Sequence, residues 1–258
     1  MKSTSLKTFS GLAVMIDLRN FSEVSRRLLI QKKKPFSNTL KWRIYEVIFD
    51  FLSDTMETII GSNNDILFDF KHTGDGFLLV TKHHRNRSQH FINGFLLLLD
   101  IYLHLDQSVP ELNTKIIDLL EDNPKIVSGN RQLRYIENLF TNMSGSIWRK
   151  YIDFSVGAHC GTIFYKTYGT QKIFLGNTIN QASRFQALSK TFSDYNLFFS
   201  QEVSSRLGKA IKNPNLFSEL STKWFKDLDR IEIKGFGPTA VKTIERKHVG
   251  RFKEKLIP

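Results

Sequence analysis

The sequence predicts a single α+β domain over residues 1–258, in which helices, strands and short hairpins are mixed along the chain. Three observations lead to this fold class. The chain is 41% hydrophobic and holds 22 phenylalanines, enough to fill a substantial core. Short apolar runs of strand length stand at residues 11–18 and 77–80, whereas apolar residues recur at helical spacing through residues 41–60. Few glycines and prolines interrupt these patterns.

Two of the predicted strands lead to an aspartate. The apolar run at residues 11–18 predicts a buried strand that contains Asp17, a charge that is costly to bury unless something pairs with it. Residues 66–70 and 77–80 predict a hairpin with Asp75 at its tip. An ordinary Asp-Gly turn is the alternative interpretation of Asp75 when it is taken alone.

The remaining elements follow from the same periodicities. A helical insertion without assigned chemistry is expected at about residues 84–150. Helices are expected at residues 20–30, 41–60, 91–105, 110–120, 131–140 and 201–211, and strands at 151–159, 162–166, 196–199, 231–233 and 240–244. In the helix over 41–60, the side chains expected in the core are Trp42, Tyr45, Ile48, Phe49, Leu52, Met56 and Ile59.

Residues 175–184 predict a strand end, a tight glycine turn and the start of a helix that runs to about Lys190. Thr178 or Asn177 is expected to cap this helix. Asn180 and Arg184 are four residues apart and therefore lie on one face. An amide beside a guanidinium offers donors that suit phosphate or ribose oxygens. An amphipathic helix with a solvated polar face explains the same pattern.

Charge and composition limit the partners and the compartment. The net charge of +12 suits nucleic acid, an acidic membrane surface or a polyanionic small molecule. We expect no nucleic-acid partner, because the chain shows no zinc-finger, helix-turn-helix or RNA-recognition pattern. We expect no membrane span, because the longest apolar run, residues 95–99, is interrupted at Asp100. One cysteine and the lack of a signal-peptide pattern predict a cytoplasmic protein.

Four motifs stand in order along the chain, at residues 16–22, 71–76, 175–184 and 233–235. Together with residues 156–161, they resemble the catalytic domain of the class III nucleotidyl cyclases, over about residues 10–82 and 151–246. The resemblance implies a ferredoxin-like palm sheet with helices packed on it. It also implies a lyase that converts a ribonucleoside triphosphate into a 3′,5′-cyclic nucleotide and pyrophosphate.

The resemblance further implies a role for each motif. Asp17 and Asp75 match the aspartates that bind two Mn²⁺ or Mg²⁺ ions, together with a backbone carbonyl at Leu18 or the residue before it. Asn180 matches the residue that orients the ribose, and Arg184 the residue that stabilises the charged α-phosphoryl group. Lys234 matches the lysine for the β- and γ-phosphates.

In this family the metal ligands and the Asn–Arg pair come from different subunits. The resemblance therefore implies a head-to-tail homodimer with two interface sites.

The base-binding residues depart from the family pattern. Lys71 matches a lysine that reads adenine, but Ile173 stands where adenylate cyclases carry an aspartate. Ser155 stands where some relatives carry a phosphate-binding arginine. An unmatched buried donor costs roughly 1–3 kcal/mol, so adenine and guanine, which present donors, are disfavoured beside Ile173. Uracil O4 accepts a hydrogen bond, which Lys71 can donate. We therefore expect UTP as the substrate.

A compact cyclase with altered base contacts resembles the Pycsar pyrimidine cyclases. These make cyclic UMP or cyclic CMP as bacterial antiphage messengers that a separate effector protein reads. Three alternatives stay open: an adenylate cyclase with relaxed base contacts, an inactive cyclase-like dimerisation module, and a nucleic-acid-binding protein suggested only by charge.

Overall fold

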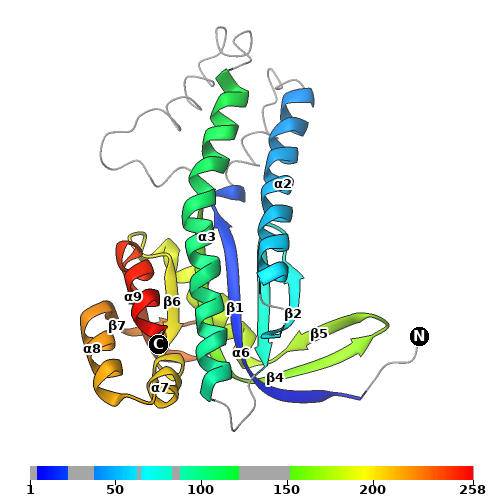
Figure 1. Ribbon diagram of the computed structural model, residues 1–258. Helices are drawn as coiled ribbons and strands as arrows, with labels where there is room; N and C mark the ends of the chain where they lie inside the picture. Colours follow the sequence, from blue (N-terminus) through cyan, green and yellow to red (C-terminus); the bar gives the residue numbers. More distant parts are fainter. Residues whose placement is uncertain (1–4, 23–37, 63–64, 83–87, 122–151, 258) are drawn as a thin grey trace. The chain divides into compact units, whose positions relative to one another are not determined.

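The computed structural model describes residues 5–22, 38–62, 65–82, 88–121 and 152–257 (Figure 1). The predicted helix at residues 131–140 and most of the one at 20–30 lie outside these ranges.

The chain divides into two compact units. One, which we call the sheet unit, takes its residues from Met1–Asp17, Ile60–Leu103 and Ser155–Pro258. The other, the helical unit, takes its residues from Leu18–Ile59 and His104–Phe154. The expectation of one domain stays a prediction.

Eight strands of the described chain form one sheet, in the order β2-β3-β1-β4-β6-β8-β7, with β5 paired to β4. β1 and β3 are antiparallel, and β4 and β6 are parallel. The strands are β1 (Lys7–Arg19), β2 (Leu67–His72), β3 (Gly76–Lys82), β4 (Asp153–Tyr168), β5 (Gln171–Leu175), β6 (Leu197–Ser200), β7 (Phe225–Ile233) and β8 (Gly237–Ile244).

Two long helices connect the first strands, α2 (Asn38–Ser62) and α3 (Ser88–Glu121). The chain order β1-α2-β2-β3-α3-β4, with β2-β3-β1-β4 as the order in the sheet, is the split βαβ arrangement of ferredoxin-like folds. The predicted α+β class is confirmed, as is the hairpin of β2 and β3.

β4 is one strand of 16 residues, so the prediction of two strands at 151–159 and 162–166 is wrong. The apparent interruption was Gly161, which stays within the strand. A Cβ at this position would lie 2.6 Å from the Thr178 hydroxyl oxygen, so glycine is needed there for a close approach. Beyond it, β4 continues as a hairpin with β5 (Figure 1), and Tyr165 of this hairpin packs against Phe9 of β1 and Phe68 of β2.

The second half of the sheet unit carries short helices: α6 (Asn177–Ala187), the 3₁₀ turn η2 (Leu188–Lys190), α7 (Gln201–Ala210), α8 (Pro214–Trp224), the 3₁₀ turn η3 (Arg246–His248) and α9 (Val249–Leu256). α6 and α7 were predicted, whereas α8 and α9 were not. The side chain of Asn213 caps α8, and Pro214 stands at its first turn. α9 lies in the basic tail and buries Val249, Phe252 and Leu256.

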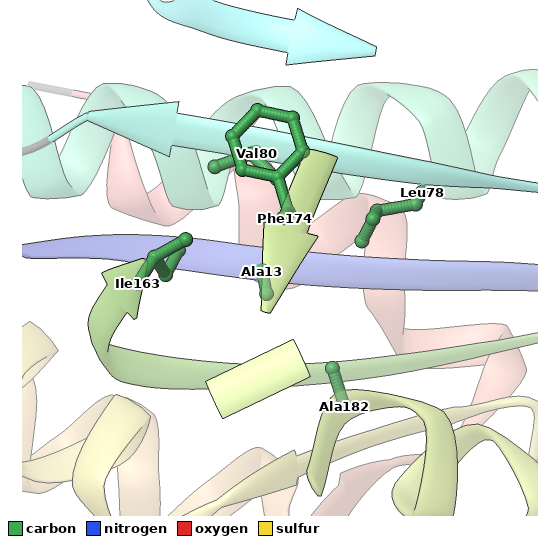
Figure 2. Packing of buried hydrophobic residues seen from close by; sticks show 6 residues of the cluster. All are labelled: Ala13, Leu78, Val80, Ile163, Phe174 and Ala182. Atoms are coloured by element: carbon green, nitrogen blue, oxygen red, sulfur yellow. The ribbon is translucent and has the colours of Figure 1, made fainter. Parts of the chain in front are cut away.

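Side chains from four strands and α6 meet in one buried cluster of the sheet unit. Figure 2 shows Ala13 of β1, Leu78 and Val80 of β3, Ile163 of β4, Phe174 of β5 and Ala182 of α6. Each of the six is less than a tenth exposed. The inward position of Ala182 shows which face of α6 is buried, and therefore which face can contact a ligand.

The residues of α2 that belong to the helical unit correct the predicted core stripe. Ile48, Leu52 and Ile59 are buried as expected. Trp42 is 74% exposed and Phe49 is 60% exposed, so both expectations are wrong. Leu40 and Ile44 are buried instead, which continues a spacing of four residues from Ile48. Tyr45 and Met56 are half-buried.

α3 runs without interruption through Pro110, so the prediction of separate helices at 91–105 and 110–120 is wrong. Proline removes one backbone donor from a helix interior. Here the apolar stripe keeps its phase on both sides of it, since Leu105, Val109, Leu112 and Ile116 are all buried. No helix in the described part of the chain is both long and apolar enough to span a bilayer.

Candidate active site

Asp17 and Asp75 come together across two neighbouring strands. The register of β1 and β3 places Asp17 opposite Gly76, and the two carboxyl groups share a hydrogen bond. A Cβ at Gly76 would lie 2.1 Å from the carbonyl oxygen of Ile16 and 2.9 Å from the Cα of Asp17. The glycine after Asp75 is thus required by the close approach of β1, beyond its role in the turn.

The environment of Asp17 opposes its negative charge. The pKa of Asp17 is raised from 3.8 to about 7, mainly by burial and further by the charge of Asp75 and the hydrogen bond with it. The positive charge of Lys190 and a hydrogen bond from Gln186 act in the opposite direction. In the absence of a further cation, the pair therefore holds a proton near neutral pH.

Gln186 of α6 connects Asp17 to the interior of the sheet unit. Its side-chain amide donates to Oδ2 of Asp17 at 3.1 Å and to Oγ of Ser155 on β4. Gln186 is only 7% exposed, and Ser155 is fully buried. Sequence reasoning missed Gln186. The available signal was a polar residue on the face of the helix that otherwise carries Thr178, Ala182 and Phe185.

The donor set of this pair fits a hard divalent cation. Carboxylate oxygens and backbone carbonyls are ligands of Mg²⁺ and Mn²⁺, and Mg²⁺ often binds through only one or two carboxylates plus substrate phosphates. Burial and the facing carboxyl group of Asp75 raise the pKa of Asp17, an effect that a bound cation would oppose. Leu18, whose backbone carbonyl oxygen is expected to be a metal ligand, follows Asp17 in β1. Among the described residues, no group of three or more His, Cys, Asp and Glu side chains could hold a metal ion.

The opposite face of α6 carries Asn180 and Arg184, both exposed. The predicted caps of this helix are wrong: Gly176 occupies the cap position, with a φ of 127° that favours glycine, and no side chain caps the helix. Thr178 is turned inward instead and donates its hydroxyl to the carbonyl of Thr162 at 2.8 Å. Helix α6 therefore directs Asn180 and Arg184 outward and Gln186 inward.

The predicted phosphate and base contacts lie on three hairpins of the sheet unit. Lys234 is exposed at the turn between β7 and β8, where Gly235 has a φ of 87°. The ammonium of Lys71 on β2 lies 5.8 Å from the ring centre of Phe174 on β5. Ile173 precedes Phe174 and is 47% exposed. Because side chains alternate along a strand, Ile173 faces away from the side on which Lys71 contacts Phe174.

Solved structures with a similar fold include adenylyl and guanylyl cyclases. The adenylyl cyclase CyaB from P. aeruginosa has a TM-score of 0.56 at 14% identity, over 93% of this chain and 96% of that one. The guanylyl cyclase Cya2 has a TM-score of 0.54 at 10% identity, over 93% and 94%. The catalytic core of a rhodopsin-guanylyl cyclase with converted specificity, in complex with ATPαS, has 0.52 at 16%, over 94% and 98%. No family model and no curated protein matches the sequence.

Proposed function

We propose that this protein is a nucleotidyl cyclase, which converts a ribonucleoside triphosphate into a 3′,5′-cyclic nucleotide and pyrophosphate. One observation carries the proposal. Asp17 of β1 and Asp75, directly before β3, meet at neighbouring strands of a ferredoxin-like sheet, and solved structures of similar fold include an adenylyl and a guanylyl cyclase. A pair of carboxylates at this place suits the binding of metal-complexed phosphates.

In the proposed reaction, the ribose 3′-oxygen forms a bond to the α-phosphorus. The bond from that phosphorus to the bridging oxygen breaks, pyrophosphate leaves, and the hydroxyl proton passes to water. Two Mg²⁺ or Mn²⁺ ions held by Asp17 and Asp75 would supply charge neutralisation at the attacking and leaving oxygens. Asn180 orients the ribose, and Arg184 stabilises the charge that develops on the α-phosphoryl group. Lys234 binds the β- and γ-phosphates.

The direction of Arg184 supports a site that is shared between two copies of the chain. Arg184 and Gln186 are two residues apart on α6, which is about 200° around the helix axis. Gln186 contacts Asp17, so Arg184 is directed away from the carboxylates of its own chain. We therefore propose a head-to-tail homodimer, in which each site takes Asp17 and Asp75 from one subunit and Asn180 and Arg184 from the other.

For the base, we propose UTP as the preferred substrate and cyclic UMP as the product. Lys71 is a half-buried donor that suits uracil O4. The apolar Ile173, on the other face of β5, offers no acceptor to an amino group on its side of the strand. The messenger would serve bacterial antiphage defence through a separate effector protein. The second candidate is an adenylate cyclase, favoured by the similarity to a solved adenylyl cyclase and by the fact that a lysine also suits adenine N1.

The test is a competition in which purified protein receives ATP, GTP, CTP and UTP at equal concentrations, with Mn²⁺ in one series and Mg²⁺ in another. Products are identified by mass. We expect cyclic UMP as the main product, cyclic CMP second and little cyclic AMP. Dominant cyclic AMP would replace the uridylate assignment with the adenylate one. No cyclic nucleotide in either series would instead favour an inactive dimerisation module.

A further inference from the structure

We propose that Gln186 is a positioning residue for the metal site, which holds the Asp17 carboxylate in a fixed orientation through its side-chain amide. The inference rests on the proposed function, because it concerns the site at which Asp17 and Asp75 are expected to bind divalent cations. It is carried by two hydrogen bonds, from the amide to Oδ2 of Asp17 at 3.1 Å and to Oγ of Ser155.

The chemistry of the amide suits this role. A glutamine side chain has two N–H donors, and here one partner is Asp17 and the other is the fully buried Ser155. The bond to Oδ2 restrains the rotation of the carboxylate. Because the amide is neutral, it stabilises the ionised form of Asp17 without placing a competing positive charge at the metal position.

The backbone of Gln186 is held in place by β4. A Cβ added to Gly157 would lie 2.1 Å from the backbone nitrogen of Gln186 and 2.2 Å from the carbonyl oxygen of Ala182. The helix backbone therefore rests directly on the strand, with Ala182 and Phe185 both fully buried. A side chain anchored this tightly cannot follow Asp17 if the carboxylate rotates, so it sets the orientation of the carboxylate.

The experiment measures the binding of Mn²⁺ alone to the full chain, by counting free Mn²⁺ in electron paramagnetic resonance spectra. Gln186→Met keeps the length of the side chain and removes the donors. We expect it to weaken Mn²⁺ binding by about 10- to 100-fold, the usual effect of losing an outer hydrogen bond to a metal ligand. Ser155→Ala removes only the anchor of the amide and should weaken binding in the same direction but less.

Two reference variants make the result specific. Gln201→Met changes a glutamine on α7 whose side-chain amide donates to Ser205, and it should leave Mn²⁺ affinity unchanged. Asp17→Ala reports on the site itself and should abolish binding at the same position. Thermal melting of each variant separates a loss of affinity from a loss of folded protein. If Gln186→Met does not fold, Ser155→Ala alone decides, and wild-type affinity in it overturns the inference.

The outcomes also separate this inference from the proposed function. If Asp17→Ala abolishes binding while folded Gln186→Met binds Mn²⁺ within about twofold of the wild type, the positioning role is wrong and the metal site stands. If Asp17→Ala binds Mn²⁺ as the wild type does, the metal assignment itself is wrong and the inference falls with it.

Discussion

Asp17 and Asp75 are half-buried and hydrogen-bonded to each other, whereas Asn180, Arg184 and Lys234 are exposed. The two groups differ in burial because the free energy needed to bring their members together differs. Facing carboxylates repel each other, so strands, a glycine contact and Gln186 hold them in place. Amide, guanidinium and ammonium groups are stable in water and need no such support. In the proposed dimer, the acidic half of each site is thus built within one chain, and the donor half comes from the other.

Loss of the acidic half should have the largest effect. Asp17→Ala or Asp75→Ala should each lower cyclase activity by about three orders of magnitude or more, because bound metal ions supply several kcal/mol of charge stabilisation. Activity is measured as cyclic nucleotide formed, and folding by circular dichroism. Asp227→Ala, which removes an exposed carboxylate paired with Lys242, is the matched control and should stay active. Full activity in either site variant would remove the two-metal interpretation.

Mixing variants tests whether the two halves come from different copies. Asp17→Ala and Arg184→Ala proteins, each inactive, should recover activity when their subunits exchange, up to about a quarter of the wild-type level. The limit arises because half of the dimers are mixed and each mixed dimer has one intact site. A mixture of Asp17→Ala and Asp75→Ala should stay inactive, since both changes fall in the same half. Absence of recovery despite demonstrated exchange would contradict a shared site.

Base selection should respond more modestly. Ile173→Asp introduces the missing acceptor and should shift the preference from UTP toward ATP or CTP by about tenfold, as one repaired hydrogen bond allows. The ratio of products in the four-nucleotide competition measures the shift. Leu175→Asp places a carboxylate two residues further along β5, at another exposed apolar position, and should leave the ratio unchanged. An equal shift in both variants would count against Ile173 as a base contact.

The smallest effect concerns stability. The folded-state pKa of Asp17, about 7, lies above its ordinary value of 3.8. The folded state therefore binds the proton more tightly than the unfolded state does. The stability of the metal-free protein consequently falls as the pH rises between these two values. Asp17→Asn cannot ionise. It should raise the melting temperature by about 2–4 °C at about pH 8 in the presence of a chelator, with little change at about pH 4. A similar rise at both pH values would contradict the repulsion of the pair.

Much of the sheet and the acidic pair followed from the sequence. Short apolar runs identified β1 and β3, and the turn residues between β2 and β3 placed Asp75 at the hairpin. The prediction that the strand breaks near Gly161 was wrong. A glycine that allows a helix to approach a strand closely cannot be distinguished in the sequence from a glycine in a turn. The helix break predicted at Pro110 was also wrong, because the packing of the neighbouring apolar residues maintains the helix.

The parts that could not be predicted depend on contacts distant in sequence. Gln186 contacts Asp17 across 169 positions of the chain, and no periodicity indicates such a bond. Trp42 and Phe49 were wrongly predicted to lie in the core of α2, because they match a helical stripe as well as Leu40 and Ile44 do. Only packing distinguishes the two sets. α8 was missed although its signals, Asn213 followed by Pro214, were present.

α6 touches the acidic group of its own chain through Gln186 and presents Asn180 and Arg184 outward. In the proposed dimer, one rigid helix therefore belongs to two reaction centres. Asn180 and Gln186 are separated by about 9 Å along the helix axis, too short a length for the helix to absorb a displacement by bending. A nucleotide that binds Asn180 and Arg184 at one centre and displaces the helix would also displace Asp17 at the other centre. The two centres would then be thermodynamically linked, and by reciprocity metal binding at one would change nucleotide affinity at its twin.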